Sequence, residues 1–275
     1  MYRLSIITIN RNNAEGLRKT LASVAAQTYR EIEHIIIDGA STDDSVDVIR
    51  EYESANLSSS HPLTIIWLSE PDNGVYHAMN KGIRKAQGEY LLFLNSGDFL
   101  IANDVITKVF DVCNGADILC AQCNVSRNGN KECTIALPQT ITFGRIYLHG
   151  LPHQSIFIKR TLFDEYGLYR EDFKYNSDIA FWYKSIIDNN ASTQTINVVT
   201  TDYNLEGISS RECNSEQYIR EKAEILRPYS RFTPDYDKWR REKEILNKYL
   251  WIERHKYLQR CLTLFYKMLK HVNRL

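Results

Sequence analysis

The chain has 275 residues, 43% of them hydrophobic and 25% charged, and its 34 Lys and Arg side chains balance 34 Asp and Glu. This composition is typical of an ordinary globular protein, and the neutral balance argues against a nucleic-acid partner. No stretch approaches the roughly 18–20 apolar residues that span a bilayer, and the apolar start, Met1–Asn10, is too short for a signal peptide. We therefore expect a cytoplasmic protein, attached at most peripherally to the inner face of the cytoplasmic membrane.

The first half of the chain alternates short β-rich runs with helical patterns. Periodicity and capping residues predict, in chain order, strand Leu4–Ile9, helix Ala14–Gln27, strand Glu33–Ile37, helix Asp43–Glu53, strand Leu63–Leu68, helix Val75–Ala86, strand Tyr90–Leu94, helix Asn103–Val112 and strand Asp117–Val125. Such alternation, with nearly continuous apolar strands, predicts an α/β fold with a buried, mostly parallel sheet flanked by helices.

Polar loops follow the first four expected strands at the point where each strand ends. They are Asn10–Asn12, Asp38–Asp43, Ser69–Gly74 and Asn95–Asp98. Open parallel sheets bind ligands beyond the carboxyl ends of their strands, so these loops share the edge where a ligand is expected. Turns favour Asp, Asn and Gly for conformational reasons alone. A set of carboxylates without matching bases nevertheless suits a divalent cation and hydrogen bonds to a nucleoside.

Missing motifs disfavour several enzyme classes that share such a sheet. The first strand is not followed by Gly-x-Gly-x-x-Gly, and the sequence lacks Gly-x-x-x-x-Gly-Lys-Ser/Thr, which argues against dinucleotide-binding and P-loop enzymes. The Gly-x-Ser-x-Gly elbow of α/β-hydrolases is missing as well. Cys120 and Cys123 invite a zinc interpretation, but residues three apart in a strand point to opposite faces, which disfavours it.

Seven segments together resemble the family 2 glycosyltransferases. They are Ser5–Asn12, Thr20–Thr28, Ile36–Asp43, Glu70–Gly82, Phe93–Asp98, Pro152–Arg160 and Asn176–Trp182. The last four are similar to segments of the bacterial enzymes that assemble O-antigen, colanic acid and capsular polysaccharides. The resemblance runs from Ser5 to Tyr183. The Gln-x-x-Arg-Trp pattern of processive synthases is absent, so we expect one sugar to be added per acceptor.

The resemblance implies the GT-A fold, a nucleoside-diphosphate sugar donor, a divalent metal (Mn²⁺ or Mg²⁺) and inversion at the anomeric carbon. It places a glycosyltransferase domain over residues 1–210, with a nucleotide-binding half at 1–100 and an acceptor half at 101–210. Residues 211–275 are expected to form a basic amphipathic helical extension.

Asp38 resembles the family's carboxylate that accepts the uracil imide N–H, a contact that selects uridine over cytidine. An Asp that starts the following turn is the simpler alternative. Arg11 and Lys81 are expected to neutralise donor phosphate. The full expected nucleotide-binding set is Thr8, Asn10, Arg11, Asp38, Asp72 and Lys81.

Asp98 is the expected metal ligand. The family usually carries an acidic cluster here, whereas this sequence has Asn95 and Gly97 where further carboxylates are usual. Mg²⁺ or Mn²⁺ can be held by one or two carboxylates together with substrate phosphates and waters. The expected donor and acceptor pocket consists of Asn80, Asn95, His153 and Gln154.

Asp178 is the expected catalytic base, because the family carries at this position the carboxylate that takes the acceptor hydroxyl proton. It begins the helical stretch Asp178–Asp188, where a helix N-cap would explain an Asp equally simply. The two roles are compatible, since a cap orients its carboxylate. A positioned base contributes about 10²–10⁴-fold to such a transfer.

The end of the chain is strongly basic. Residues 238–275 carry eleven Lys and Arg against three Glu, a net charge of +8. Residues 238–272 are expected to form one or two helices with an apolar stripe and aromatic rings beside basic side chains, a pattern that suits an anionic membrane surface. Packing on the catalytic domain or self-association through the same helices is the alternative.

We therefore expect an inverting glycosyltransferase that moves one hexose or N-acetylhexosamine from a UDP-sugar to a lipid-linked saccharide in cell-surface polysaccharide synthesis. One alternative is a catalytically weak regulatory or scaffold protein of the same fold, suggested by Asn95 and Gly97. The other is a sugar nucleotidyltransferase, which would require a Gly-rich basic loop after the first strand.

Overall fold

The structure is a computed structural model that describes residues 2–127, 129–205, 212, 215–231 and 233–254. The chain divides into two compact units, residues 1–223 and 224–275. The first unit contains the whole sheet. The domain boundary expected after residue 210 lies before this division, so most of the first helix of the expected extension belongs to the first unit.

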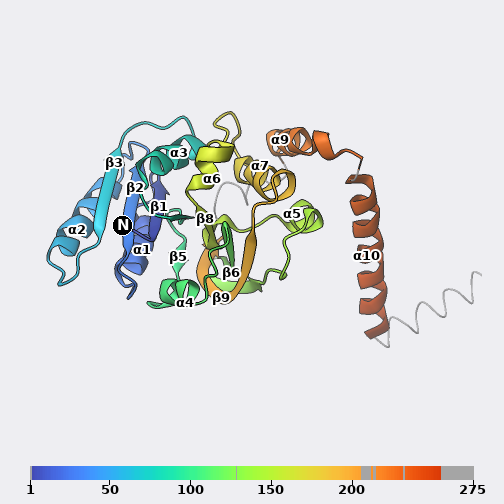
Figure 1. The fold of residues 1–275 in the computed structure, drawn as a ribbon, viewed down its shortest axis with the longest axis horizontal. Helices are drawn as coiled ribbons and strands as arrows, with labels where there is room; N and C mark the ends of the chain where they lie inside the picture. The colour runs from blue at the N-terminus through green and yellow to red at the C-terminus, as the bar shows by residue number, and fades with distance from the viewer. Residues whose placement is uncertain (1, 128, 206–211, 213–214, 232, 255–275) are drawn as a thin grey trace, which may run out of the picture. The chain divides into compact units, whose positions relative to one another are not determined.

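The first half of the chain alternates strands and helices in the order expected. It contains β1 (Leu4–Asn10), α1 (Ala14–Ala25), β2 (Ile32–Asp38), α2 (Ser45–Leu57), β3 (Thr64–Ser69), α3 (Val75–Lys85) and β4 (Tyr90–Phe93). The strands β3, β2, β1 and β4 lie side by side, and all pair in parallel. The expected α/β fold, with a sheet flanked by helices, is thereby confirmed (Figure 1).

The second half turns the sheet into a mixed one. Its elements are β5 (Phe99–Leu100), α4 (Val105–Asp111), β6 (Ile118–Arg127), β7 (Asn130–Ile135), α5 (Phe143–His149), η1 (His153–Ser155), β8 (Ile156–Lys159), α6 (Thr161–Tyr166), α7 (Ser177–Trp182), the π-helical turn η2 (Tyr183–Asp188) and β9 (Thr193–Asn204). The strand order is β3-β2-β1-β4-β8-β6-β9-β5, and β7 pairs with β6. Strand β8 runs antiparallel to both β4 and β6.

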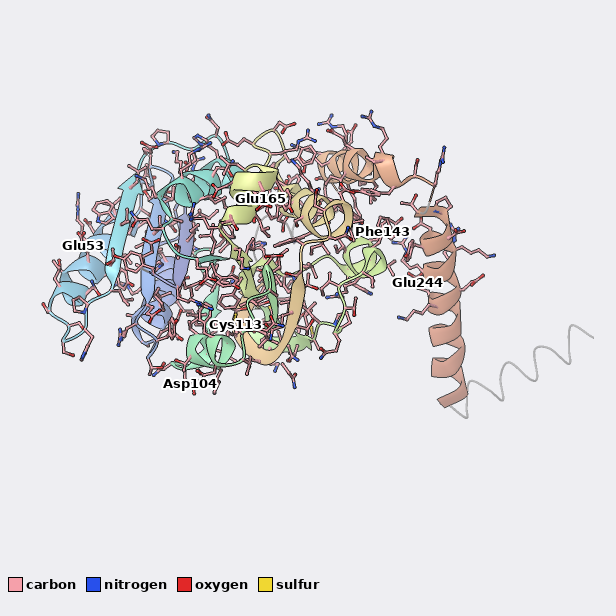
Figure 2. All side chains as sticks on the ribbon, in the orientation of Figure 1. Glu53, Asp104, Cys113, Phe143, Glu165 and Glu244 are labelled. Atoms are coloured by element: carbon pink, nitrogen blue, oxygen red, sulfur yellow. The ribbon has the colours of Figure 1, made fainter. Side chains whose placement is uncertain are left out.

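Alternating side chains give the sheet two apolar faces. On one face, alternate residues of β1 and β4 share a core cluster with residues of α1 and α4; its members include Leu4, Ile6, Tyr90, Leu92, Val24, Val105, Ile106 and Val109. On the other face, Ile7 lies against Gly82 of α3, where a Cβ on the glycine would come 2.4 Å from Ile7 Cγ2. Figure 2 shows side chains filling the space between the sheet and its helices.

An aromatic cluster fixes the helices of the second face. The ring of Phe93 in β4 contacts the rings of Phe163 in α6 and of Tyr169. Phe163 stacks on Phe181 of α7 with 4.4 Å between centroids, and Tyr76 of α3 contacts Tyr169 at 5.5 Å. Aromatic pairs of this kind contribute roughly 0.5–1.5 kcal/mol each beyond area burial. Helices α3, α6 and α7 are therefore held together around one strand.

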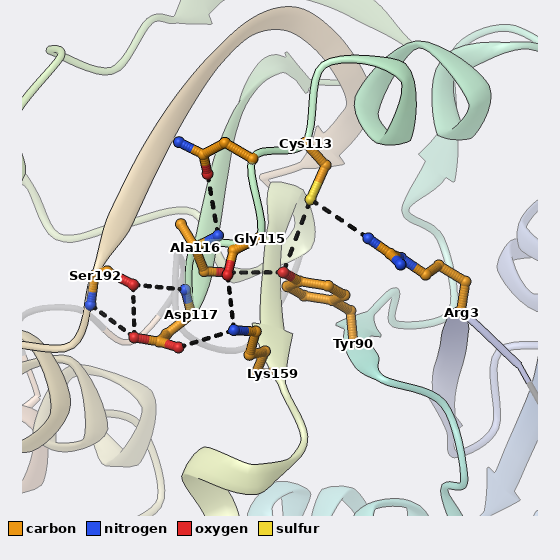
Figure 3. A network of polar contacts seen from close by, with 9 residues as sticks. Arg3, Tyr90, Cys113, Gly115, Ala116, Asp117, Lys159 and Ser192 are labelled. Carbon is orange, nitrogen blue, oxygen red and sulfur yellow. Dashed lines mark hydrogen bonds and ion pairs between the residues drawn. The ribbon is translucent and has the colours of Figure 1, made fainter.

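A polar network ties the strands together at the edge opposite the carboxyl ends of the parallel strands (Figure 3). The Tyr90 hydroxyl donates to the Ala116 carbonyl at 2.7 Å, next to the start of β6. Asp117 accepts hydrogen bonds from the backbone and hydroxyl of Ser192, which precedes β9, and pairs with Lys159 at the end of β8 at 3.1 Å. Strands that are far apart in sequence are thus fixed in register at one end.

The helices after the sheet are α9 (Glu216–Leu226), the 3₁₀ turn η3 (Arg227–Tyr229) and α10 (Thr233–Arg254). Helix α10 covers the first part of the helical stretch expected over residues 238–272, and the part after Arg254 lies outside the described residues. The side chains of its expected apolar stripe, from Ile245 onward, are not among those described. Within the described ranges, no helix combines the length and the apolar character needed to cross a bilayer.

Candidate active site

Strand register brings three polar residues side by side at the carboxyl edge of the sheet. Asn10 of β1 pairs with Asp38 of β2, and Asp38 pairs with Ser69 of β3. The Asn10 amide nitrogen donates to Asp38 Oδ1 at 2.8 Å, and the Ser69 hydroxyl donates to Asp38 Oδ2 at 2.7 Å. Since each of these residues ends its strand, the apolar pattern of the strands places their polar side chains together.

Asp38 is fully buried, and its carboxylate is saturated with hydrogen bonds. Beyond Asn10 and Ser69, the Ser41 backbone N–H donates to Oδ2 at 2.9 Å and the Ser41 hydroxyl donates to Oδ1 at 2.5 Å. Burial alone would raise the pKa of Asp38, but the hydrogen bonds from Ser41, Ser69 and Asn10 together hold this pKa below its ordinary value. The group is therefore an ionised acceptor whose roughly four lone-pair positions are all occupied.

At Gly39, next to Asp38, two other side chains come close to the backbone. A Cβ at this position would come 3.0 Å from Asp72 Oδ2 and 3.4 Å from Arg11 Cδ. Three of the expected nucleotide-binding residues, Arg11, Asp38 and Asp72, thus converge around the backbone of one glycine. Arg11 is exposed, and its guanidinium makes no hydrogen bond or ion pair within the described part of the chain.

Lys81 lies at the same edge but is already paired. Its ammonium group is 2.6 Å from Asp72 Oδ1 and 2.8 Å from Glu70 Oε1. Partial burial works to lower the pKa of Lys81, but hydrogen bonds to Asp72 and Glu70 outweigh it and raise this pKa. Lys81 is therefore charged and shared between two carboxylates, so a donor phosphate would have to compete with them.

Two of the expected site residues are directed elsewhere. Thr8 is fully buried in β1, and its hydroxyl lies 2.9 Å from Nε2 of His34 in the neighbouring strand. Asn80 is buried in α3, where its amide donates to the Tyr169 carbonyl and accepts from the Tyr169 N–H. Its nitrogen also donates to Glu171 at 2.9 Å. Asn80 thus fastens a loop to α3, and its amide is not brought together with His153.

The turn after β4 buries the expected metal ligand. The Asp98 N–H donates to the Asn95 carbonyl at 3.0 Å, and Gly97 adopts a φ of +105°, which favours glycine at this position. Thr20 of α1 fixes the turn, because its hydroxyl donates to the Asp98 carbonyl at 2.7 Å and accepts from the Gly97 N–H at 3.0 Å. An Asp or Glu at position 97 would therefore have a strained backbone conformation.

Asp98 has an unusual charge environment. Burial raises the pKa of its carboxyl group to about 7, against the lowering effects of the Asn204 N–H, nearby His153 and a hydrogen bond from the Gln154 side chain. The Asn204 N–H donates to Asp98 Oδ1 at 3.1 Å. The carboxylate of Asp202 on β9 is close enough to raise this pKa further. Below about pH 7 the group therefore holds a proton, which a cation could replace.

Asp178 is held from three directions in the first turn of α7. Its Oδ1 accepts the Ile179 N–H at 2.9 Å and lies 3.0 Å from the Tyr76 hydroxyl. Its Oδ2 lies 3.3 Å from His153 Nδ1. The helix begins at Ser177 with Asn176 as its N-cap, so Asp178 itself is not the cap residue. The carboxylate nevertheless satisfies one of the free N–H groups of the first helical turn.

His153 links Asp178 to the turn after β4. Its second ring nitrogen, Nε2, lies 3.3 Å from the amide nitrogen of Asn95. One neutral tautomer satisfies both contacts, since Nδ1–H then donates to Asp178 and Nε2 accepts from Asn95. In this arrangement Asn95 Oδ1 is buried and has no hydrogen-bond partner in the described part of the structure. The structure thus joins Asp178, His153 and Asn95, which are far apart in sequence.

The residues around Asp98 fit a divalent cation in part. Asp98 supplies one carboxylate and the unpartnered Asn95 Oδ1 supplies a second oxygen in the same turn. No group of three or more His, Cys, Asp or Glu side chains in the described ranges is arranged to hold a metal ion. Such a set suits a hard cation that takes its remaining ligands from a phosphate and water.

Sequence reasoning missed three residues that organise this site. Ser41 and Ser69 saturate Asp38, and Tyr76 contacts Asp178. Ser41 lies within an expected polar loop and Ser69 follows a strand directly, so their placement at the edge was visible in the sequence. No sequence signal joins Tyr76 to Asp178, because the contact spans 102 residues and depends on how α3 and α7 pack.

Comparison with known proteins identifies the family. The sequence profile of glycosyl transferase family 2 matches residues 5–170. A protein of Mycobacterium tuberculosis described as an uncharacterized glycosyltransferase is 32% identical over 235 residues, which cover 82% of this chain and 85% of that protein. The Escherichia coli enzyme WfgD, described as a UDP-Glc:alpha-D-GlcNAc-diphosphoundecaprenol beta-1,3-glucosyltransferase, is 22% identical over 227 residues and covers 82% and 85% of the two chains.

Solved structures show the same fold. Residues 1–349 of S. aureus TarS, in complex with UDP-GlcNAc, superpose with a TM-score of 0.61 at 19% identity, over 82% of this chain and 66% of that one. Against the longer TarS chain, the match spans 42% of its length. The mannosyltransferase PcManGT from Pyrobaculum calidifontis, in complex with GDP-Man and Mn²⁺, gives a TM-score of 0.56 at 17% identity, over 73% and 56% of the two chains. The chain belongs to glycosyl transferase family 2 and is a glycosyltransferase with the GT-A fold.

Proposed function

We propose that the protein transfers one hexose or N-acetylhexosamine from a UDP-sugar to a lipid-linked saccharide, with inversion at the anomeric carbon, in cell-surface polysaccharide synthesis. The observation that carries this proposal is the position of Asp178. It is a carboxylate held by Tyr76 and His153, and His153 connects it to the turn that contains Asn95 and Asp98. The proposed base and a candidate diphosphate-binding turn are therefore linked through one histidine side chain.

A single displacement needs one base and one stabilised leaving group. The acceptor hydroxyl forms a bond to the anomeric carbon on the face opposite the diphosphate, while the bond between that carbon and the diphosphate oxygen breaks. The hydroxyl proton passes to Asp178, and the electron pair leaves with UDP. Asp178 accepts from Ile179 and contacts His153, and it shares the single proton of the Tyr76 hydroxyl with the Tyr175 carbonyl. At least one of its roughly four lone-pair positions is therefore available to accept the acceptor proton.

A uridine donor is supported by Asp38 and by two similar proteins. An ionised carboxylate can accept the uracil imide N–H, but cytosine has no proton on that nitrogen. Since Asp38 is saturated, the Ser41 hydroxyl must release Oδ1 when a base binds. TarS was crystallised with UDP-GlcNAc, and WfgD is described as using UDP-Glc. The sugar carried by the UDP is thus proposed to be a hexose or its N-acetylamino form.

Mn²⁺ or Mg²⁺ is proposed to accompany the donor, as Mn²⁺ accompanies GDP-Man in the PcManGT structure. Asp98 and Asn95 Oδ1 are the residues that would hold it. When bound, such an ion neutralises the charge that develops on the leaving diphosphate. Arg11 is exposed at this edge, and we assign it to the same diphosphate.

A lipid-linked acceptor is supported by WfgD, whose described acceptor is a diphosphoundecaprenol-linked sugar. The basic tail supports it independently, since a charge of +8 over residues 238–275 favours an anionic lipid surface. A nucleotide-sugar donor together with such an acceptor favours a location at the cytoplasmic face of a membrane. We propose peripheral attachment there.

Donor hydrolysis and one variant test the proposal. A panel of UDP-, GDP- and CDP-sugars is scored for slow hydrolysis without acceptor, and a UDP-sugar is expected to be the substrate. In Asp178→Asn, the amide keeps an oxygen for Ile179 and Tyr76, so the fold should survive. Turnover should fall by about 10²–10⁴-fold, while calorimetry finds nearly unchanged affinity for the UDP-sugar.

The matched control is Asp164→Asn, an exposed carboxylate of α6 whose side chain is 63% accessible. It should change neither turnover nor melting temperature. Near-normal turnover in folded Asp178→Asn would mean that another group at this edge is the base, and His153 would be the first residue to test. If none of the UDP-sugars is hydrolysed, the assignment of a UDP-sugar as the donor is wrong.

A further inference from the structure

Glu221 of α9 is a buried carboxylate surrounded by backbone N–H groups. Its Oε1 accepts the Lys174 N–H at 2.7 Å and the Gln217 side chain at 3.1 Å. Its Oε2 accepts the N–H groups of Tyr175 at 3.0 Å and of Asn176 at 3.2 Å, together with the Asn176 side-chain amide. The residue is only 4% exposed. Three consecutive peptide N–H groups therefore converge on one carboxylate.

Every partner of the Glu221 side chain among the described residues is a hydrogen-bond donor. Among the described residues it forms no ion pair. Hydrogen bonds to an ionised acceptor are roughly twice as strong as neutral ones. A carboxylate placed in this way is costly unless every acceptor position is used, and here five donors face it. The arrangement orders a segment of backbone that has no regular secondary structure.

The segment that Glu221 orders leads directly into the base. Residues 174–176 immediately precede Ser177, where α7 begins, and Asp178 is the second residue of that helix. The Tyr175 carbonyl lies 2.8 Å from the Tyr76 hydroxyl, which is also 3.0 Å from Asp178 Oδ1. Glu221 thus fixes both the entry of α7 and the residue that shares a hydroxyl with the base.

We propose that Glu221 is a positioning residue, which holds residues 174–176 in the conformation that aims Asp178 at the acceptor hydroxyl. This inference rests on the proposed role of Asp178 as the base. It makes α9 (orange in Figure 1) a part of the catalytic apparatus, although α9 follows the segment matched by the family profile, residues 5–170. Glu221 touches no reacting atom and acts only through the backbone it holds.

Two variants and one control test this role in the full-length protein. Glu221→Ala removes all the acceptors, and Glu221→Gln keeps one oxygen but turns the other into a donor that opposes a peptide N–H. Glu216→Ala, an exposed residue of the same helix, is the control. A misplacement of about 1 Å can reduce turnover by about 10²-fold, so Glu221→Ala should lose about that factor and Glu221→Gln less. The affinity for UDP should stay constant in all three.

Hydrogen exchange provides a readout that does not depend on catalysis. The amides of Lys174, Tyr175 and Asn176 should exchange faster in Glu221→Ala than in the wild type, and they should be unchanged in Glu216→Ala. If these amides stay protected in folded Glu221→Ala, the hydrogen bonds do not order the segment and the proposal is wrong. Calorimetry with UDP on the same preparations shows whether the nucleotide half remains folded.

A double-mutant cycle separates positioning from general damage. If Glu221 acts through Asp178, adding Glu221→Ala to Asp178→Asn should cause no further loss of turnover, because the aimed group is already gone. An equal loss in both backgrounds would overturn the positioning role. The two hypotheses also fail differently. If the Asp178→Asn single variant has normal turnover, Asp178 is not the base. If Glu221→Ala has normal turnover while Asp178→Asn has low turnover, only the proposed role of Glu221 is wrong.

Discussion

At the scale of single residues, the two key carboxylates differ in how many acceptor positions they keep. Asp38 is saturated by Asn10, Ser41 and Ser69, whereas Asp178 retains at least one position after its contacts with neighbouring groups. The hydrogen bonds keep Asp38 rigid and charged, and release of the Ser41 hydroxyl frees the position that a base N–H would occupy. A carboxylate with a free position can take a proton. The division of roles between them therefore follows from hydrogen-bond counts as well as from family resemblance.

Replacing Asp38 by Asn should remove the discrimination between nucleobases. The carboxylate can only accept, so it favours uracil, whose ring nitrogen carries a proton; an amide can donate to the unprotonated nitrogen of cytosine instead. Calorimetric titration with UDP and CDP should find a preference for UDP in the wild type and its loss or reversal in Asp38→Asn. Ser41→Ala serves as the control, because it frees one position on Asp38 and should leave the preference for UDP intact. An unchanged preference in Asp38→Asn would exclude this residue as the group that recognises the base.

The raised pKa of Asp98 predicts how stability and metal affinity depend on pH. Its value of about 7 lies above the ordinary 3.8, so between these limits the folded state keeps a proton that the unfolded chain has lost. Stability should therefore fall as pH rises from about 4 to about 7, and Asp98→Asn should flatten this dependence. A cation needs the ionised form, so the Mn²⁺-dependent part of UDP binding should strengthen by up to about tenfold per pH unit until pH 7 and then level off.

Thermal melting and UDP titration across this pH range, with Mn²⁺ or EDTA, measure both effects. Asp98→Asn should weaken UDP binding far more in Mn²⁺ than in EDTA. Equal binding by wild type and variant in Mn²⁺, or full turnover in EDTA, would show that Arg11 and Lys81 manage the diphosphate without a metal at Asp98.

At the scale of elements, the sequence revealed the parallel first half of the sheet far better than the mixed second half. Strands β1 to β4 are short apolar runs separated by helices with clear periodicity, so the local pattern and the tertiary fold agree. Strand β8 has only four residues, and β9 (Thr193–Asn204) is rich in Thr and Asn and alternates weakly in burial. Both depend on neighbouring strands for their structure, which a local pattern does not contain.

The same limit applies to the site. Residues that end strands, such as Asn10 and Asp38, could be placed from the sequence because parallel register is regular. The contacts of Asp178 with Tyr76 and of Glu221 with residues 174–176 arise from the packing of helices that are distant in sequence. Thr8 and Asn80 are expected in the site because they lie in the family motifs. Their side chains instead form hydrogen bonds with buried partners, which the motifs do not reveal.

The contact between α3 and β1 should be intolerant of one added methyl group. A Cβ on Gly82 would come 2.4 Å from Ile7 Cγ2 in the fully buried core. Overpacking costs typically 1–3 kcal/mol, which exceeds the roughly 1 kcal/mol that alanine gains over glycine in a helix. Gly82→Ala should therefore lower the free energy of unfolding by up to about 2 kcal/mol in urea titrations. The shift of α3 should also reduce turnover, since Tyr76 lies on this helix.

Ile7→Ala provides the background that tests the cause. It removes the clashing atom, so Gly82→Ala should be neutral or stabilising when added to Ile7→Ala. The same destabilisation in both backgrounds would mean that the glycine is required for another reason than its contact with Ile7.

At the scale of the whole molecule, charge is distributed very unevenly. The net charge of zero conceals +8 over residues 238–275 and −8 over the rest. An acidic catalytic unit has no electrostatic reason to approach an anionic bilayer, whereas the basic tail does. The charge distribution thus supports separate roles for the two parts of the chain. The tail would bind the surface that holds the acceptor, and the catalytic unit would carry out the transfer.

Neutralising the tail should detach the protein from anionic membranes without stopping catalysis. We would replace Arg260, Lys267, Lys270 and Arg274 by Gln and measure cosedimentation with vesicles of phosphatidylcholine, with and without phosphatidylglycerol. Each basic residue near an anionic surface contributes about 1 kcal/mol, so the four changes should weaken binding by up to about a thousandfold. Salt should weaken wild-type binding in the same direction, because it screens these charges. Turnover of a water-soluble acceptor should be unaffected, while turnover of a lipid-linked acceptor in vesicles should fall. If the wild type does not bind anionic vesicles and sediments as a dimer that dissociates when the apolar residues of the tail are changed, the tail serves self-association instead.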